Sequence, residues 1–218
     1  MSADRLERAA EVWIADYFLA RHLVRTRDWV LRLDPAADLA LRIAALTHDI
    51  ERRVPGGPRL DPWRQTWDEP GYLLAHSIRS AQIVAVWLAD NGAAADVCAS
   101  VERLILHHEI GGYPEADLLQ AADSLSFLEV NGHRPRVWVE EGRCDAASAQ
   151  AKLDWMRDRI TVAAARPAAA HYHAAASAAL CGEAATFAPA APPHPPSFSV
   201  SGPTEGDKRC GPGIHRDP

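Results

Sequence analysis

The segment ALTHDIERR, residues 45–53, places a histidine and an aspartate side by side where an apolar stretch ends. Ile43, Ala44 and Leu46, which precede the pair, are typical of a helix that buries most of its surface. A single buried histidine or a single capping aspartate would need no special explanation. The pair becomes informative if further residues that can bind a metal occur at comparable positions along the chain.

The composition is that of an ordinary folded domain and argues against several classes of protein. The chain has 218 residues, a formal net charge of -6 and 48% hydrophobic residues, which does not favour a nucleic-acid polymer as partner. No apolar stretch approaches the ~20 residues of a membrane span, so we expect no membrane partner. The charged N-terminus and the unpaired spacing of the cysteines at positions 98, 144, 181 and 210 favour a cytoplasmic location.

Helical periodicity dominates the first two thirds of the chain, and we expect an all-α bundle of about five to six helices. A short exception is RPRVWVEEG, residues 134–142, which favours a strand or an extended arm. Asp34 is expected to cap the second helix. The expected helices cover residues 3–33 with a break near His22, 34–50, 71–90, 94–109, a segment after Pro114, and 146–166.

The composition changes after residue 166, where alanine and proline become dominant. We therefore expect a helical domain over residues 1–166 and a mostly disordered tail over residues 167–218. Pro167 should end or kink the preceding helix. His171 and His173 would then be solvated tail residues without a ligand role.

Residues that can bind a metal recur on successive predicted helices. Each one alone is more often a hydrogen-bonded core residue or a solvated one. Burying all of them without a shared partner would cost ~1–3 kcal/mol for each unpaired group. A metal centre would satisfy them together. The set is His22, His48, Asp49, His76, His107, His108 and Asp123.

This ordered set on an all-helical chain resembles the HD superfamily of metal-dependent phosphohydrolases over roughly residues 10–130. The stretch HHEIGGYP, residues 107–114, also resembles a shortened form of the HHE…GYP signature of the HD-GYP branch. Members of that branch with three metals have a glutamate four residues before the position of His22. Phe18 stands there in this chain, so we expect one or two metal ions.

The resemblance implies which residues hold the metals. His22, His48, Asp49 and Asp123 would bind one ion, and Asp49 would bridge to a second. His76 and a histidine of the fourth helix would complete the second site. A carboxylate suits the bridging position because an imidazole offers a metal only one lone pair. Mixed nitrogen and oxygen ligands fit Mn, Fe, Co or Zn.

The resemblance also bears on the two neighbouring histidines of the fourth helix. The HD-GYP branch favours His107 as the ligand of the second metal, which leaves His108 to contact the phosphate or to donate a proton. Other HD hydrolases have one histidine followed three residues later by glycine, and His108 with Gly111 fits that spacing. Leu104 precedes both histidines, so apolar periodicity does not choose between them. We assign His107 to the metal.

The implied activity is hydrolysis of a phosphate ester, for example a nucleotide or cyclic nucleotide, by a metal-bound hydroxide. Asp49, Arg52 and His108 are the expected catalytic residues. Arg52 stands where many HD proteins have a lysine that contacts the substrate phosphate, and its guanidinium could do the same. The alternative for Arg52 is an exposed residue favoured by the helix dipole.

Two other functions and one loop stay open at this point. Some proteins of the same fold use a mixed-valent di-iron pair as oxygenases with small polar substrates, and a non-enzymatic regulator could keep the fold. The loop over residues 53–69 contains Trp63 and Trp67, which could hold a nucleobase or could anchor the loop. The expected partner is a small phosphorylated substrate, and the sequence does not define the oligomeric state.

Overall fold

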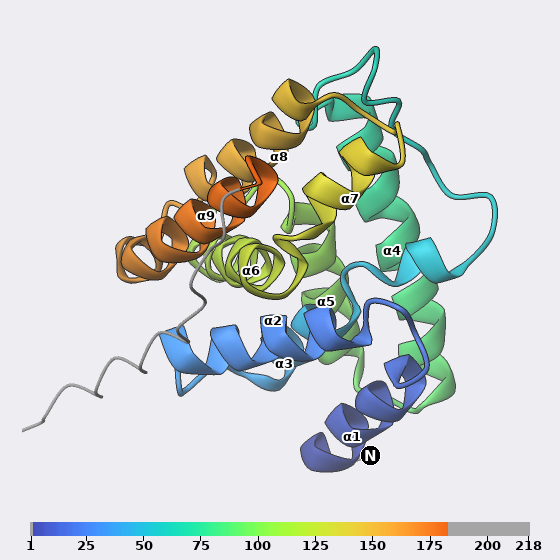
Figure 1. Cartoon of the computed structure of the whole chain (residues 1–218). Helices are drawn as coiled ribbons and strands as arrows, with labels where there is room; N and C mark the ends of the chain where they lie inside the picture. Colours follow the sequence, from blue (N-terminus) through green and yellow to red (C-terminus); the bar gives the residue numbers. More distant parts are fainter. Residues whose placement is uncertain (1, 183–218) are drawn as a thin grey trace, which may run out of the picture. The chain divides into compact units, whose positions relative to one another are not determined.

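The fold is all-helical, as the periodicity predicts (Figure 1). The structure, a computed structural model, describes residues 2–182, and within them there is no strand. Among these residues no helix combines the length and apolar character needed to cross a membrane. The α-helices are α1 (Ala3–Ile14), α2 (Ala20–Leu33), α3 (Leu39–Thr47), α4 (Pro70–Asp90), α5 (Ala95–His107), α6 (Pro114–Ser126), α7 (Arg134–Glu140), α8 (Ala146–Asp158) and α9 (Arg166–Leu180).

The start of the chain forms two helices where nearly continuous helix was predicted. The break lies between Ile14 and Ala20, ahead of His22. The cap of α3 also differs from the prediction, because Asp38 and not Asp34 occupies it. The Asp38 carboxylate accepts a hydrogen bond from the backbone N–H of Leu41 at 2.8 Å, which satisfies one of the free donors of the first turn.

Residues 134–142 are not a strand or an extended arm, because α7 covers most of them. Pro135 lies in the first turn of this helix, where its missing N–H costs nothing, and it is buried. Trp138 stacks on Trp67 with ring centroids 5.3 Å apart. The alternating Val137 and Val139 favoured a strand, but packing of α7 against α8 decides the conformation.

The predicted tail also begins too early, because residues 166–180 form α9. Pro167 starts this helix and does not end one. Ala169, Tyr172 and Ala176 of α9 are buried, and the ring centroid of Tyr172 lies 6.3 Å from that of Trp29. The helix also packs on α8, where Nε2 of His173 lies 2.7 Å from the Asp154 carboxylate. Alanine permits this close packing, so the composition misled the prediction. The predicted disorder of residues 183–218 falls outside the described residues.

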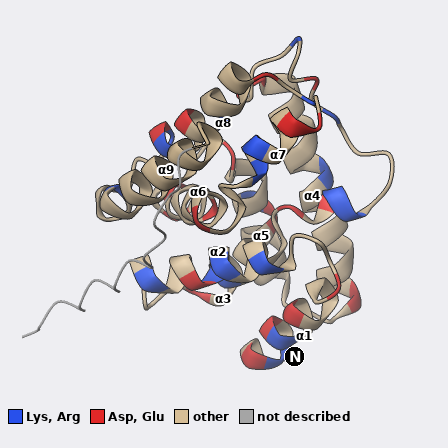
Figure 2. Cartoon of the chain, viewed as in Figure 1, with Lys and Arg blue, Asp and Glu red and all other residues tan. Residues whose placement is uncertain are grey.

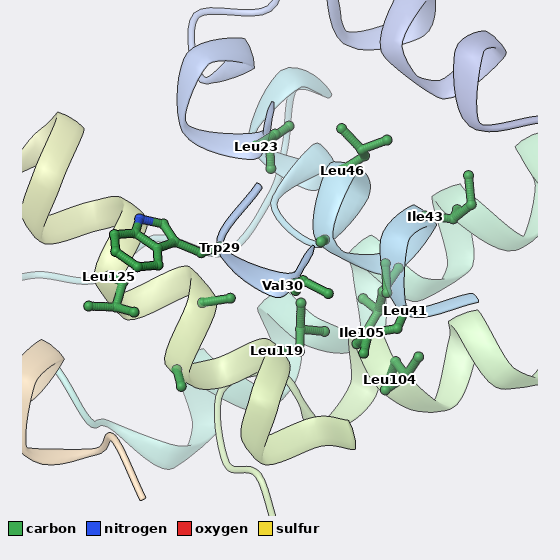
Figure 3. Packing of buried hydrophobic residues seen from close by; sticks show 14 of the residues in the cluster. Leu23, Trp29, Val30, Leu41, Ile43, Leu46, Leu104, Ile105, Leu119 and Leu125 are labelled. Atoms are coloured by element: carbon green, nitrogen blue, oxygen red, sulfur yellow. The ribbon is translucent and has the colours of Figure 1, made fainter. Parts of the chain in front are cut away.

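An apolar core joins the helices that carry the predicted metal ligands (Figure 3). Helix α2 packs on α3 and α6, and α5 packs on α3 and α4. Each contributes large aliphatic side chains that are almost fully removed from solvent. The labelled members include Leu23, Val30, Leu41, Ile43, Leu46, Leu104, Ile105, Leu119 and Leu125.

Ion pairs hold α1 to this core. Figure 2 shows residues of both charge signs along α1. Arg27 of α2 lies 2.9 Å from the carboxylates of Glu7 and Glu11 on α1, and Arg42 of α3 lies 2.9 Å from Glu7. These pairs are partly exposed, so they orient α1 more than they stabilise it.

Candidate metal centre

Four histidines form a polar cluster in the interior of the helical bundle. His22 comes from α2, His76 from α4, and His48 and His108 directly follow the last residues of α3 and α5. Their relative exposures are 3%, 0%, 1% and 0% in that order, which is unusual for so many polar groups together. The ring centroid of His48 lies 5.5 Å from that of His22 and 5.1 Å from that of His108. The ring centroids of His76 and His108 are 5.3 Å apart.

Two aspartates complete the cluster. Oδ1 of Asp123 on α6 lies 3.1 Å from Nε2 of His22 and 3.4 Å from Nε2 of His48. Oδ1 of Asp49 lies 2.9 Å from Nε2 of His76, and its Oδ2 lies 4.0 Å from Nε2 of His22. Asp49 therefore reaches both halves of the cluster with its two oxygen atoms.

Two overlapping groups in this cluster could each hold a metal ion. The first comprises His22, His48 and Asp49, and the second comprises Asp49, His76 and His108. In each group the three potential ligand atoms lie within 4.8 Å of one another. The groups share Asp49, and a carboxylate is the side chain that can serve two ions at once.

Backbone carbonyls fix the ring orientation of two histidines. Nδ1 of His48 lies 3.1 Å from the carbonyl oxygen of Ala45, and Nδ1 of His108 lies 2.7 Å from that of Ile105. A carbonyl can only accept, so Nδ1 must carry the proton and donate it. In the neutral ring the free lone pair is then on Nε2.

Side chains fix the other two histidines in the same way. Nδ1 of His76 lies 2.8 Å from the carboxylate of the buried Glu51. Nδ1 of His22 lies 2.8 Å from Oγ of Ser126, and that hydroxyl donates its own proton to the His22 carbonyl at 2.8 Å. Ser126 must therefore accept from the ring, and His22 also presents a bare Nε2 to the cluster.

The Nε2 atoms show that the residues suit a metal. Those of His48, His76 and His108 are buried and form no hydrogen bond of good geometry among the described residues, although carboxylate oxygens that can only accept lie near those of His48 and His76. Buried polar atoms without partners are rare in native proteins, because each costs the free energy of its lost hydration. Lone pairs that converge with carboxylates form a donor set that could hold a metal ion.

The structure brings His108, and not the predicted ligand His107, into the cluster. His107, expected to be the metal ligand, is half-buried outside the cluster, with Nδ1 3.2 Å from the carbonyl oxygen of Gly111. His108, expected to contact the phosphate, belongs to the cluster. Gly111 has a φ of 67°, and a Cβ there would meet the carboxylate of Asp117 at 2.3 Å, so only glycine fits this turn.

Sequence reasoning missed two charged residues of the site. Oε1 of Glu109 lies 3.6 Å from Nε2 of His108 and 3.9 Å from Nε2 of His76. Arg159, the residue after α8, forms ion pairs with both Glu109 and Asp123. Glu109 follows His108 directly and could have been suspected, whereas no local pattern marks Arg159.

Arg52, expected to contact the substrate phosphate, lies at the edge of the cluster. Its Nε is 3.2 Å from Oδ1 of Asp49, and one terminal nitrogen donates to the hydroxyl of Tyr72 at 2.7 Å. The side chain is 35% exposed, so it can reach a bound molecule. Tyr17 donates a hydrogen bond to the backbone carbonyl of Asp49 at 2.9 Å and helps to fix this residue, which the two groups share.

Charges within the cluster keep its carboxylates ionised. Burial alone would raise the pKa of Asp49, but the charge of Arg52 and the imidazole of His76 outweigh burial and hold the pKa well below its usual value. Arg159 does the same for the pKa of Asp123 against the effect of burial. Burial lowers the pKa of His108 to about 4, so this ring is neutral near pH 7.

A cavity of about 620 Å³ opens beside the cluster. Asp49, Asp123 and Arg52 line one part of it, and α7, α8 and the loop over residues 53–69 supply other parts. Trp67 anchors this loop, because its indole N–H donates to the carbonyl of Ser148 at 2.7 Å. The volume lies within the ~300–1,000 Å³ usual for small-molecule sites.

The chain matches no protein-family model, no curated protein sequence and no solved structure.

Proposed function

We propose that this protein is a metal-dependent phosphohydrolase that cleaves a phosphate ester of a small molecule. The observation that carries the proposal is the pair of buried ligand groups that share Asp49. Such a shared carboxylate is the arrangement expected of two metal ions acting on one phosphoryl group. The resemblance to the HD superfamily, drawn from the order of the same residues, agrees with it.

The residues present define how the ions would be held. His22, His48 and Asp123 would bind one ion, His76 and His108 the other, and Asp49 both. When bound, the metal pair would activate water and polarise a phosphoryl oxygen. Glu109 lies close enough to the second group to contribute an oxygen ligand or to hold water by hydrogen bonds.

Other residues would bind and orient the substrate. Arg52 has a guanidinium edge at the mouth of the cavity, where it can donate two hydrogen bonds to phosphoryl oxygens. Tyr72 holds Arg52 in place through its hydroxyl and stacks on His76 with centroids 6.1 Å apart. Arg159 keeps Asp123 and Glu109 ionised and turned towards the histidines.

Metal analysis combined with a substrate screen tests the proposal. The purified protein should contain one or two transition-metal ions of the Mn, Fe, Co or Zn type per chain. It should release phosphate from members of a phosphate-ester panel, and chelation should abolish that release. Oxygen uptake with an iron-loaded protein and no phosphate release would favour the oxygenase instead. A protein that binds no metal would refute both enzymatic functions and leave the regulator.

A further inference from the structure

The cavity wall, with the residues of the cluster included, carries more positive than negative charge. Its basic residues are Arg52, Arg59, Arg134, Arg143, Lys152 and Arg159, and its acidic residues are Asp49, Asp61, Glu109 and Asp123. Most of the basic side chains have an evident partner or lie in solvent. Arg52 and Arg159 pair with carboxylates of the cluster, Arg143 pairs with Glu141, and Arg59 is exposed.

Lys152 and Arg134 differ from these, because both are half-buried and neither forms an ion pair or hydrogen bond within residues 2–182. The Lys152 ammonium lies over aromatic rings, 4.2 Å from the centroid of Trp155 and 5.1 Å from that of Phe127. The Arg134 guanidinium lies 5.7 Å from the ring centroid of Phe18. Aromatic faces attract cations but accept none of their N–H hydrogen bonds well, so the donors stay available to a ligand.

Holding these two cations in the wall is unfavourable in the ligand-free protein. Burial lowers the pKa of Lys152 to about 7. Burial also lowers the pKa of Arg134, and the nearby charges of Arg143 and Arg52 add to the effect. An anion in the cavity would relieve both costs, since it supplies the missing acceptors and the missing negative charge.

We propose that Lys152 and Arg134 form an anion subsite, and that the molecule bound in this cavity carries two anionic groups. One group, at the metal cluster, rests on the proposed function. The other is a phosphate or a carboxylate held by Lys152 of α8 and Arg134 of α7. The substrate class is thus a small phosphate ester with a second acidic group, and not an ester of a neutral alcohol.

Calorimetry on the full-length metal-loaded protein tests the subsite without requiring turnover. The probes are ω-phosphonocarboxylates with two to four carbons and alkylphosphonates of the same lengths. At least one phosphonocarboxylate should bind at least about tenfold more tightly than its alkylphosphonate counterpart, as expected when Lys152 and Arg134 both donate charge-assisted hydrogen bonds to the second acidic group. Equal affinities throughout both series, or no binding of any probe, would overturn the subsite.

Variants identify the residues responsible. Lys152→Met and Arg134→Gln should each remove most of the advantage of the second acidic group and leave the alkylphosphonate affinity unchanged. Arg136→Gln is the matched control, because Arg136 lies on α7 but pairs with Glu140 at the surface. Equal weakening of both probe series, or an effect of Arg136→Gln as large as that of Arg134→Gln, would overturn the assignment.

The result is separable from the proposed function. Metal content and thermal unfolding of each variant show whether the fold and the cluster remain intact. If the subsite prefers two anionic groups while no phosphate ester is hydrolysed, the anion subsite stands and the hydrolase proposal fails. If esters are hydrolysed but the second acidic group brings no advantage, the hydrolase stands and the subsite fails.

Discussion

The same helices build two interiors of opposite character, one aliphatic and one ionisable. Leu23 follows His22 on α2, and Leu46 lies two residues before His48 at the end of α3. In the aliphatic interior the buried side chains are apolar and pack on one another. In the ionisable interior all four histidines have a partner at Nδ1, whereas Nε2 of His48, His76 and His108 forms no hydrogen bond among the described residues. The contrast indicates that the first interior stabilises the fold and the second is prepared for a ligand.

The largest expected effect comes from removing the residue that joins the two metal groups. Asp49→Ala should lower metal affinity by more than the ~10–100-fold typical of an outer partner and should abolish phosphate release. Asp49→Asn should behave alike, because an amide bridges two cations poorly. Metal analysis and a phosphate assay measure both effects.

Asp28→Ala is the control for this variant, since the Asp28 carboxylate pairs with Arg27 near the surface of α2. It should retain metal and activity. A fully active Asp49→Ala protein would refute the proposal that the ionisable interior binds the catalytic metals through Asp49.

A comparison of the neighbouring histidines gives the next largest effect. His108→Ala should lose metal from the second group, since His108 is inside the cluster. His107→Ala should keep its metal, because that ring contacts Gly111 and Tyr113 outside it. Metal titration of the two variants measures which histidine binds the metal. Loss of metal in His107→Ala but not in His108→Ala would support the sequence-based assignment of His107.

The aliphatic interior should respond in stability and not in metal binding. Leu119→Ala should reduce the free energy of unfolding by about 2–5 kcal/mol, because Leu119 is fully buried on α6. Its half-buried neighbour Leu118 supplies the control, and Leu118→Ala should cost less. Urea unfolding measures both values. Lost metal in a still-folded Leu119→Ala protein would show that the two interiors are coupled.

The smallest expected effect comes from Glu51, which contacts a histidine of the cluster and does not itself face the metal groups. Glu51→Gln should weaken metal binding by ~10-fold, because the amide orients His76 but no longer adds charge. Glu129→Gln is the matched control, because it makes the same chemical change at a glutamate that contacts Arg25 and Trp29 on the side of the aliphatic interior. Glu129→Gln should leave metal affinity unchanged. Equal losses in both variants would mean that Glu51 acts only through general stability.

Local patterns predicted the helical class and most of the cluster. Apolar periodicity placed α4 within a residue or two, and the adjacency of His48 and Asp49 pointed to the centre. Periodicity could not separate His107 from His108, which lie ~100° apart on one helix and both border an apolar face. Arg159 directly follows α8 and is 36 residues from Asp123 in the sequence. Only the packing of α8 in the folded chain brings it to the site.

The helix at residues 166–180 and α7 were misjudged for a related reason. The valines favoured a strand over residues 134–142, and the alanine- and proline-rich composition favoured disorder after residue 166, although alanine has the highest helix propensity of all residues. Both segments are helices that pack on α8. The half-buried Lys152 gave no signal either, because a lysine in a helix is ordinarily a solvated residue.

Metal ions bound as proposed would link metal occupancy to the folding equilibrium, because only the folded chain brings the four imidazoles together in a fixed orientation. A group that binds the native state and not the unfolded chain raises the apparent stability by RT ln(1 + [L]/Kd), or about 2.7 kcal/mol at a hundredfold excess over Kd. The melting temperature of this protein should therefore follow the free metal concentration. In a cell, the supply of that metal would then govern how much of the chain survives as folded protein.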